Sequence, residues 1–106
     1  MATTVTIEPG ICNLTCVVNA QLVDEDELEI DVATGCAAIN GMIEALGNTF
    51  DAFEVCLQKP GVGPFYDYAR EHFPVHVSCP ALCGIIKAME VEAKLALPKD
   101  ASIRFQ

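Results

Sequence analysis

The chain has 106 residues, 52% of them hydrophobic, and carries a formal net charge of −9. This length fits one domain, because independent domains usually run to about 100–150 residues, and the apolar content is too high for a disordered chain. The acidic balance argues against nucleic acid as a partner, because a phosphate backbone repels a surface of its own sign.

The first part of the chain is predicted to form strands. Val5 and Ile7 alternate with threonines up to the turn dipeptide Pro9-Gly10, which indicates a short strand. Apolar and polar residues then alternate from residue 11 to 23, which predicts a second strand. Acidic and aliphatic residues alternate over 27–32, so a third strand is expected to pair with the second as a hairpin.

The second part is predicted to be helical. Apolar residues recur every three or four positions from Cys36 to Leu46, which indicates an amphipathic helix. A short helix is expected from residue 48 or 49 to 57, where it would bury Phe50, Phe53 and Leu57. Another helix starts at Pro64, because proline suits the first helical position.

The last helix is predicted to begin at Cys79-Pro80 and to be ended by Pro98, which cannot continue it. Residues 102–105 alternate again and predict a final strand that rejoins the sheet. Strands followed by helices and one returning strand are typical of an α+β domain over residues 1–106. We expect a three- or four-stranded, mainly antiparallel sheet covered on one face by three or four helices.

The sequence predicts a cytoplasmic protein with no membrane partner. No segment approaches the about 18 apolar residues that span a bilayer, and residues 1–8 lack the basic and apolar regions of an export signal. The six cysteines are too sparse for a secreted disulfide scaffold. In a reducing compartment they are expected to be thiols or metal ligands.

The charges are unevenly distributed along the chain. Residues 1–58 contain ten of the fifteen acidic residues and no lysine or arginine. Two interpretations stay open: a solvated surface that keeps the protein in solution, or a face that attracts cations or a basic partner. A protein partner or a homo-oligomer is therefore among the expected interactions.

The spacing of the cysteines limits which of them can share a metal ion. Cys12 and Cys16, if both lie in one strand, are about 13 Å apart, because a strand rises about 3.3 Å per residue. Cys79 and Cys83 are four residues apart on a helix, where Cβ atoms lie about 5–6 Å from one another and can reach a common ion. Neither spacing is the C-x2-C of zinc ribbons.

The ends of the predicted helices single out further candidates. Cys79 is expected to cap the last helix and Cys36 to lie in the first turn of its own, where free N–H groups and the helix dipole favour thiolates. His76 could add a nitrogen ligand. We therefore predict a metal site of Cys12, Cys36, His76 and Cys79 at one end of the sheet, holding zinc or an iron–sulfur cluster, with Cys83 in reserve.

Each candidate also has a purely structural interpretation. Free cysteines are among the most buried residues, and Cys16 and Cys56 are interpreted as core thiols. His76 can be a loop histidine, and His72 a structural one. The common hydrolase, nucleotide-binding and metalloprotease motifs do not occur in the sequence, and a Cys79–His76 nucleophile lacks a third, orienting group. No catalytic residue is predicted.

Several segments together resemble a family of small microbial proteins of unknown function, many of them from anaerobes. The C-terminal signature carries the resemblance: His76-Val77-Ser78-Cys79-Pro80, then Lys87-Ala88-Met89-Glu90-Val91 and Leu95-Ala96-Leu97-Pro98. Residues 8–12 near the N-terminus and Cys36 also resemble the family's pattern, so the resemblance spans most of the chain. An anaerobic family implies oxygen-sensitive thiols or clusters. Cys16 and Cys83 depart from the family pattern, which favours Cys12, Cys36 and Cys79 as ligands.

Three functional hypotheses follow. The first is a metal- or iron–sulfur-binding module that uses cysteine thiolates. The second is a thiol redox protein with Cys79 as the reactive sulfur. The third is an interaction subunit without chemistry of its own, which binds another chain through its acidic half or through an uncovered sheet face.

Overall fold

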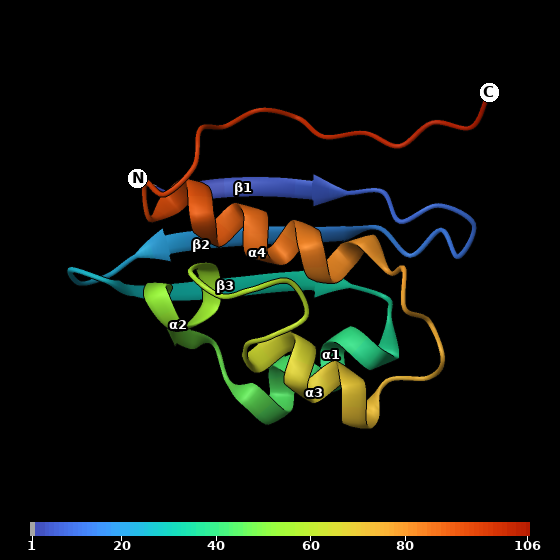
Figure 1. Cartoon of the computed structure of the whole chain (residues 1–106), viewed down its shortest axis with the longest axis horizontal. Coiled ribbons are helices and arrows are strands. Elements are labelled where there is room, and N and C mark those ends of the chain that lie inside the picture. Colours follow the sequence, from blue (N-terminus) through green and yellow to red (C-terminus); the bar gives the residue numbers. More distant parts are fainter. Residues whose placement is uncertain (1) are drawn as a thin grey trace.

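The computed structural model describes residues 2–106 (Figure 1). The elements follow one another as β1 (Ala2–Ile7), β2 (Cys16–Leu22), β3 (Glu27–Thr34), α1 (Ala37–Leu46), β4 (Thr49–Asp51), α2 (Ala52–Cys56), α3 (Pro64–His72) and α4 (Pro80–Glu92). The α+β architecture predicted from the sequence is confirmed, with four strands and four helices in this part of the chain.

The four strands form one antiparallel sheet in the order β1-β2-β3-β4. Loops connect β1 to β2 and β2 to β3, as antiparallel neighbours allow, whereas the connection from β3 to β4 contains α1. The register places Ile7 opposite Cys16 and Cys16 opposite Thr34, so these three residues form the last rung at one end of the sheet. β4 pairs with the opposite end of β3, where Phe50 lies opposite Leu28.

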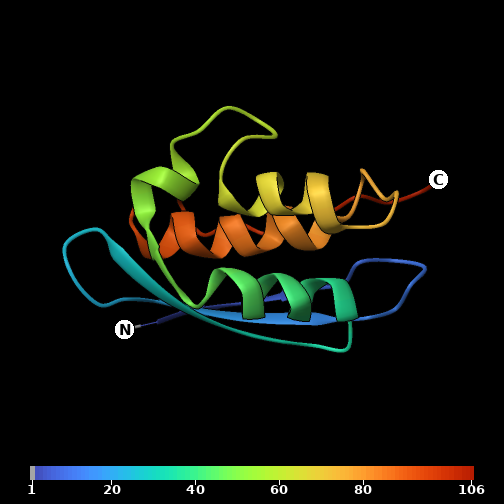
Figure 2. The same ribbon diagram turned by 90° about the horizontal axis from the view of Figure 1, so that it is seen from below.

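One face of the sheet is buried and the other is open. Side chains alternate between the two faces along β2 and β3, as the period of two in the sequence predicts. The buried face supplies Val18, Leu28 and Ile30 to a core that α1, α3 and α4 complete, with Met42, Phe65 and Ile85 respectively. Figure 2 shows the helices stacked on this side of the strands.

The last helix, α4, is fixed on β1 and β2 at both of its ends. Near its start, Gly84 packs directly against the side chain of Ile7, where a Cβ would overlap Cγ1 and Cδ1 of Ile7. Near its end, the Glu92 carboxylate accepts hydrogen bonds from Thr3 Oγ1 at 2.8 Å and from Leu22 N at 3.0 Å. These contacts orient α4 along the sheet, so that its N-terminus lies at the Ile7–Cys16–Thr34 end.

The second strand is shorter than its alternating pattern predicts. Residues 8–15 form a loop, and β2 begins only at Cys16. Two backbone positions in this loop have positive φ, 105° at Gly10 and 56° at Asn13, and Asn13 N donates a 2.9 Å hydrogen bond to Gly10 O. Such a turn interrupts a strand regardless of the polarity pattern.

The predicted helix over residues 48–57 is wrong in its first part. Thr49–Asp51 form β4, and α2 covers only Ala52–Cys56. Asp51 ends the strand and begins the helix, because its side chain accepts hydrogen bonds from the backbone N–H groups of Phe53 and Glu54. As a result Phe50 is buried, whereas Phe53 and Leu57 are exposed.

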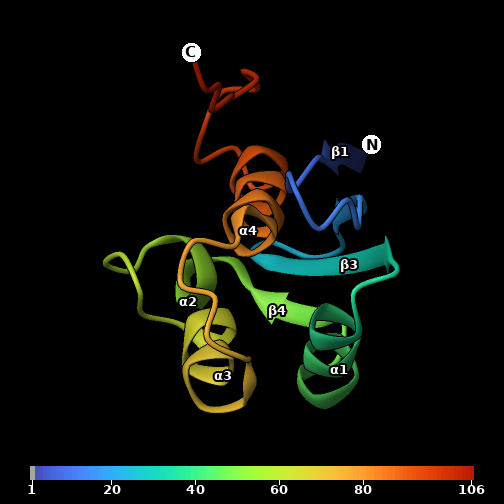
Figure 3. The same ribbon diagram turned by 90° about the vertical axis from the view of Figure 1, so that its right-hand side faces the viewer.

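The predicted final strand is also wrong. Residues 97–106 have no regular structure, and Ile103 and Phe105 are 83% and 97% exposed. Helix α4 ends at Glu92 and not at Pro98 as predicted, because Lys94 adopts a φ of 64°, which turns the chain. In Figure 3 the C-terminal segment lies outside the sheet and the helices, and Figure 1 shows it running in the same direction as β1, beyond the outer edge of that strand. No helix in residues 2–106 is long and apolar enough to cross a membrane.

Candidate functional site

Two helices begin with a cysteine at the same end of the molecule. Cys36 is the N-cap of α1 and Cys79 is the N-cap of α4, as the sequence predicts for Cys79. Neither side chain makes a capping hydrogen bond. The Cys36 N–H donates instead to Thr34 Oγ1 at 3.2 Å, which ties the start of α1 to the end of β3. Both thiols are half-buried and are not committed to a cap.

A third thiol lies beneath these two. Cys16 is fully buried at the start of β2, opposite Thr34. Burial raises the pKa of the Cys16 thiol, and the neighbouring Cys36 and Cys79 raise it further. Cys16 therefore lies within electrostatic range of both helix-capping cysteines. The convergence follows from the fold, since β3 leads into α1 beside Cys16 and the Gly84–Ile7 contact places the start of α4 over the same rung.

The loops with the other predicted ligands reach the same end. Cys12 lies in the loop over 8–15 and His76 in the loop over 73–79, and both residues are exposed. Figure 1 shows these two loops beside the starts of α1 and α4. We call this region, formed by the two loops and by Cys16, Cys36 and Cys79, the cysteine end.

The arrangement does not bring the predicted ligands to a common point. Within residues 2–106, no three His, Cys, Asp or Glu side chains lie close enough together to hold a metal ion. The metal site of Cys12, Cys36, His76 and Cys79 stays a prediction. Cys16 is buried in the core, as the sequence predicts, and it is also the thiol that neighbours both Cys36 and Cys79.

Cys83, the predicted reserve ligand, lies near Tyr66 of α3. Cys83 is exposed, one helical turn after Cys79. Burial raises the pKa of the Tyr66 hydroxyl, and Cys83 and Cys79 add to this effect, which shows that Tyr66 of α3 lies near both thiols. Cys83 itself lines a surface depression, together with Tyr66, Ile86 and Lys87.

Cys56 lies apart from this cluster, at the last residue of α2. Burial raises the pKa of its thiol to about 11, and the nearby Glu90 carboxylate contributes to the rise. Glu90 lies in the second half of α4, away from the Cys79 end. Cys56 is therefore a half-buried structural thiol that can serve as a control for the cysteine end.

These raised pKa values predict a loss of stability in alkaline solution. The unfolded Cys56 thiol ionises near its ordinary pKa of 9.0 and the folded one only near 11, so the unfolded state loses its proton first as the pH rises. The stabilising contribution is complete below pH 9 and is lost as the pH rises through about 11. Denaturant unfolding under reducing conditions should show this decline, and Cys56→Ala should reduce it. The exposed Cys83→Ala is the matched control, and an equal decline in Cys56→Ala would contradict the assignment.

A comparison with protein families places this chain. A family model matches residues 3–105. The chain belongs to DUF6951, a family of unknown function. The matched range covers the cysteine end and continues through the C-terminal segment, so both are parts of the DUF6951 domain. No curated protein and no solved structure matches the chain.

Proposed function

We propose that this DUF6951 protein binds a soft metal ion, either zinc or the iron of an iron–sulfur cluster, at its cysteine end. Cys36 and Cys79 would be the two fixed ligands, and the loops would supply Cys12 and His76. The observation that supports the proposal is the convergence of two helix N-termini at one end of the sheet, each with a half-buried cysteine at its N-cap position.

The chemistry of this end suits such a ligand set. Metals bind thiolates rather than thiols, and the partial positive charge of a helix N-terminus favours the thiolate. Structural zinc sites with two or three cysteines complete their tetrahedra with histidine. The loops over 8–15 and 73–79 contain no helix or strand, so their closure over Cys36 and Cys79 would not break an element of the fold. Cys83 would substitute for a missing loop ligand.

Metal affinity tests this proposal directly. The reduced full-length chain, handled without oxygen, is titrated with Zn²⁺ in competition with a chromophoric chelator. We expect one ion per chain, and at least about a tenfold loss of affinity in Cys36→Ser and in Cys79→Ser, since even indirect contacts to a metal are worth about 10–100-fold. Cys56→Ser removes a thiol that is outside the cysteine end, at the last residue of α2, and should leave the affinity unchanged.

Other results would contradict the proposal. An affinity that is equal in Cys79→Ser, Cys56→Ser and the unsubstituted chain would show that zinc binds elsewhere. Binding that survives in Cys12→Ser and His76→Ala but is lost in Cys83→Ser would assign the third ligand to α4 instead of to the loops. Circular dichroism of each variant separates loss of a ligand from loss of the fold.

A second candidate function rests on the accessibility of Cys79. Its thiol makes no capping hydrogen bond, is half-buried, and has a second thiol, Cys83, one turn later on α4. This arrangement favours a thiol redox role in which Cys79 is the reactive sulfur. Alkylation by iodoacetamide near neutral pH, followed by peptide mass spectrometry, should then label Cys79 faster than Cys83. Equal labelling of the two would exclude this alternative.

A further inference from the structure

The outer edge of β1 is an unprotected strand edge. β1 is the first strand of the sheet and pairs only with β2 in the part of the chain that the structure describes. Its sequence, ATTVTI, contains no charged residue, no proline and no glycine, and five of its six residues are β-branched. Natural edge strands usually carry lysine, proline or a bulge, which prevent pairing with another chain. This strand carries none of them, so it is suited to accept a further strand.

The C-terminal segment has the properties of such a strand. Ile103 and Phe105 alternate with Ser102 and Arg104, which is the period of two of a strand with one apolar face. Both apolar side chains are almost fully exposed. Residues 101–105 would extend about 16 Å, which fits along the six residues of β1, about 20 Å long. The segment lies within the range that the family model matches.

Charge favours contact of this segment with the rest of the domain. Three of the six basic residues, Lys94, Lys99 and Arg104, lie after α4, together with a single acidic residue, Asp100. The C-terminal segment is therefore basic, whereas residues 1–58 carry ten acidic residues and no lysine or arginine. Attraction between the two accelerates and orients their association.

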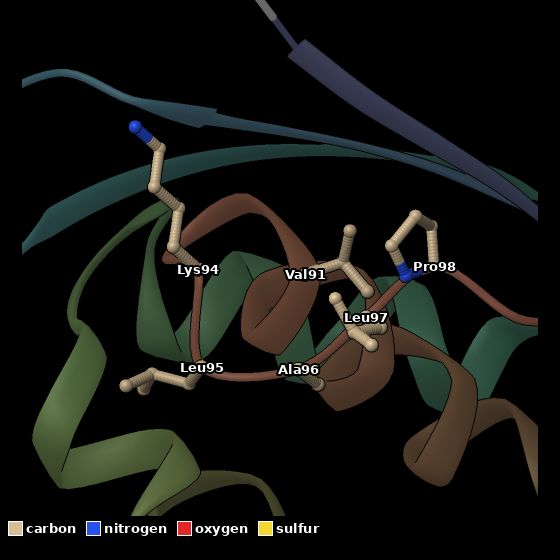
Figure 4. A pocket seen from close by; sticks show the side chains of 6 residues that line it. All are labelled: Val91, Lys94, Leu95, Ala96, Leu97 and Pro98. Atoms are coloured by element: carbon tan, nitrogen blue, oxygen red, sulfur yellow. The ribbon is translucent and has the colours of Figure 1, made fainter.

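An apolar hollow lies where an added strand would need one. It has a volume of about 350 Å³ and is lined by Val91, Lys94, Leu95, Ala96, Leu97 and Pro98 (Figure 4). Because Glu92 accepts a hydrogen bond from Thr3, this hollow lies close to the first residues of β1. A strand beside β1 could place one apolar side chain in it.

We propose that residues 101–105 of one copy of this chain add as a strand to the β1 edge of a second copy. Exchange in both directions gives a two-fold symmetric dimer in which each hollow receives an apolar side chain, Ile103 or Phe105, of the other copy. Within one copy the segment runs beyond the outer edge of β1 without pairing with it (Figure 1), so the edge and the segment both remain available to a second copy. Because every copy carries both parts, a second copy is the partner that can satisfy both edges at once. This inference is independent of the metal proposal.

Sedimentation velocity and hydrogen exchange of the reduced full-length protein test the exchange. The unsubstituted chain should sediment with twice the 11.4 kDa mass of a single chain. The double substitution Ile103→Asp, Phe105→Asp should shift it to the monomer and accelerate amide exchange in β1. Both residues are exposed within one copy, so the fold of the monomer does not depend on them. The control, Ser102→Asp with Gln106→Asp, adds the same charge to the same segment and should remain mostly dimeric.

Two results would overturn the proposal. A monomeric unsubstituted chain at about 100 µM, well above the dissociation constants of typical stable complexes, would exclude the dimer. A dimer that persists in the Ile103→Asp, Phe105→Asp variant would show that the copies associate through another surface, such as β1 against β1. If the control variant dissociates equally, charge repulsion alone explains the loss of the dimer. That result would also overturn the assignment of Ile103 and Phe105 to the dimer contact.

Discussion

Replacing Phe65 with alanine is expected to lower the free energy of unfolding by about 3–5 kcal/mol, the usual cost of truncating a buried phenylalanine. Phe65 is 1% exposed at the second residue of α3, and its ring centroid lies 4.9 Å from that of Phe50 in β4. The substitution opens a cavity between α3 and the sheet. Chemical denaturation followed by far-ultraviolet circular dichroism, with reductant present, measures the loss.

Phe53→Ala is the matched control for this prediction. Phe53 is also an aromatic residue of a short helix, but it is 49% exposed, because the capped turn at Asp51 directs it away from the core. Its truncation should cost less than about 1 kcal/mol, as most surface substitutions do. Comparable losses in the two variants would mean that α2 packs differently from the structure described above.

The sequence predicts those parts of the fold that have a local cause. The hairpin of β2 and β3 follows from alternation over several residues, and α1, α3 and α4 follow from helical periodicity together with proline at the first position of α3 and α4. β4 has only three residues, too few for any periodicity to show. Its existence depends on pairing with β3, which is a tertiary contact. The predicted final strand is absent for a related reason: an alternating pattern becomes a strand only when it pairs with a neighbouring edge, and residues 102–105 pair with no strand within one copy.

The sequence predicts at which end of the sheet the candidate site lies, but not how its thiols are arranged. Proline after Cys79 and the periodicity after Cys36 indicate two helix N-termini. The sequence therefore predicts Cys79 as an N-cap, but it places Cys36 in the first turn of its helix and not at the N-cap that it occupies. The role of Cys16 could not be, because its proximity to both caps depends on the register of β2 with β3 and on the position of α4. Gly84 is the sequence feature that indicates where α4 packs on the sheet, since a glycine inside a helix often has a packing reason.

Gly84→Ala is expected to destabilise the protein by about 1–3 kcal/mol, although alanine is the better helix former by about 1 kcal/mol. A methyl group at this position overlaps the buried side chain of Ile7, which cannot move without disturbing the rung that holds Cys16. Gly41→Ala in α1 is the matched control. There the added Cβ meets only Tyr68 Oη at an ordinary 3.8 Å, so the same substitution should stabilise the protein by about 0.5–1 kcal/mol.

The opposite signs of these two substitutions separate helix propensity from packing. If the overlap with Ile7 is the cause, shortening that side chain in an Ile7→Ala background should make Gly84→Ala neutral or stabilising, and the double-mutant cycle should give a coupling energy of at least about 1 kcal/mol. If the effects of the two substitutions are additive, the loss of stability in Gly84→Ala has a cause other than the contact with Ile7. Because this contact places the start of α4 over Cys16, Gly84→Ala should also weaken any binding that needs Cys79, and it should do so without removing a thiol.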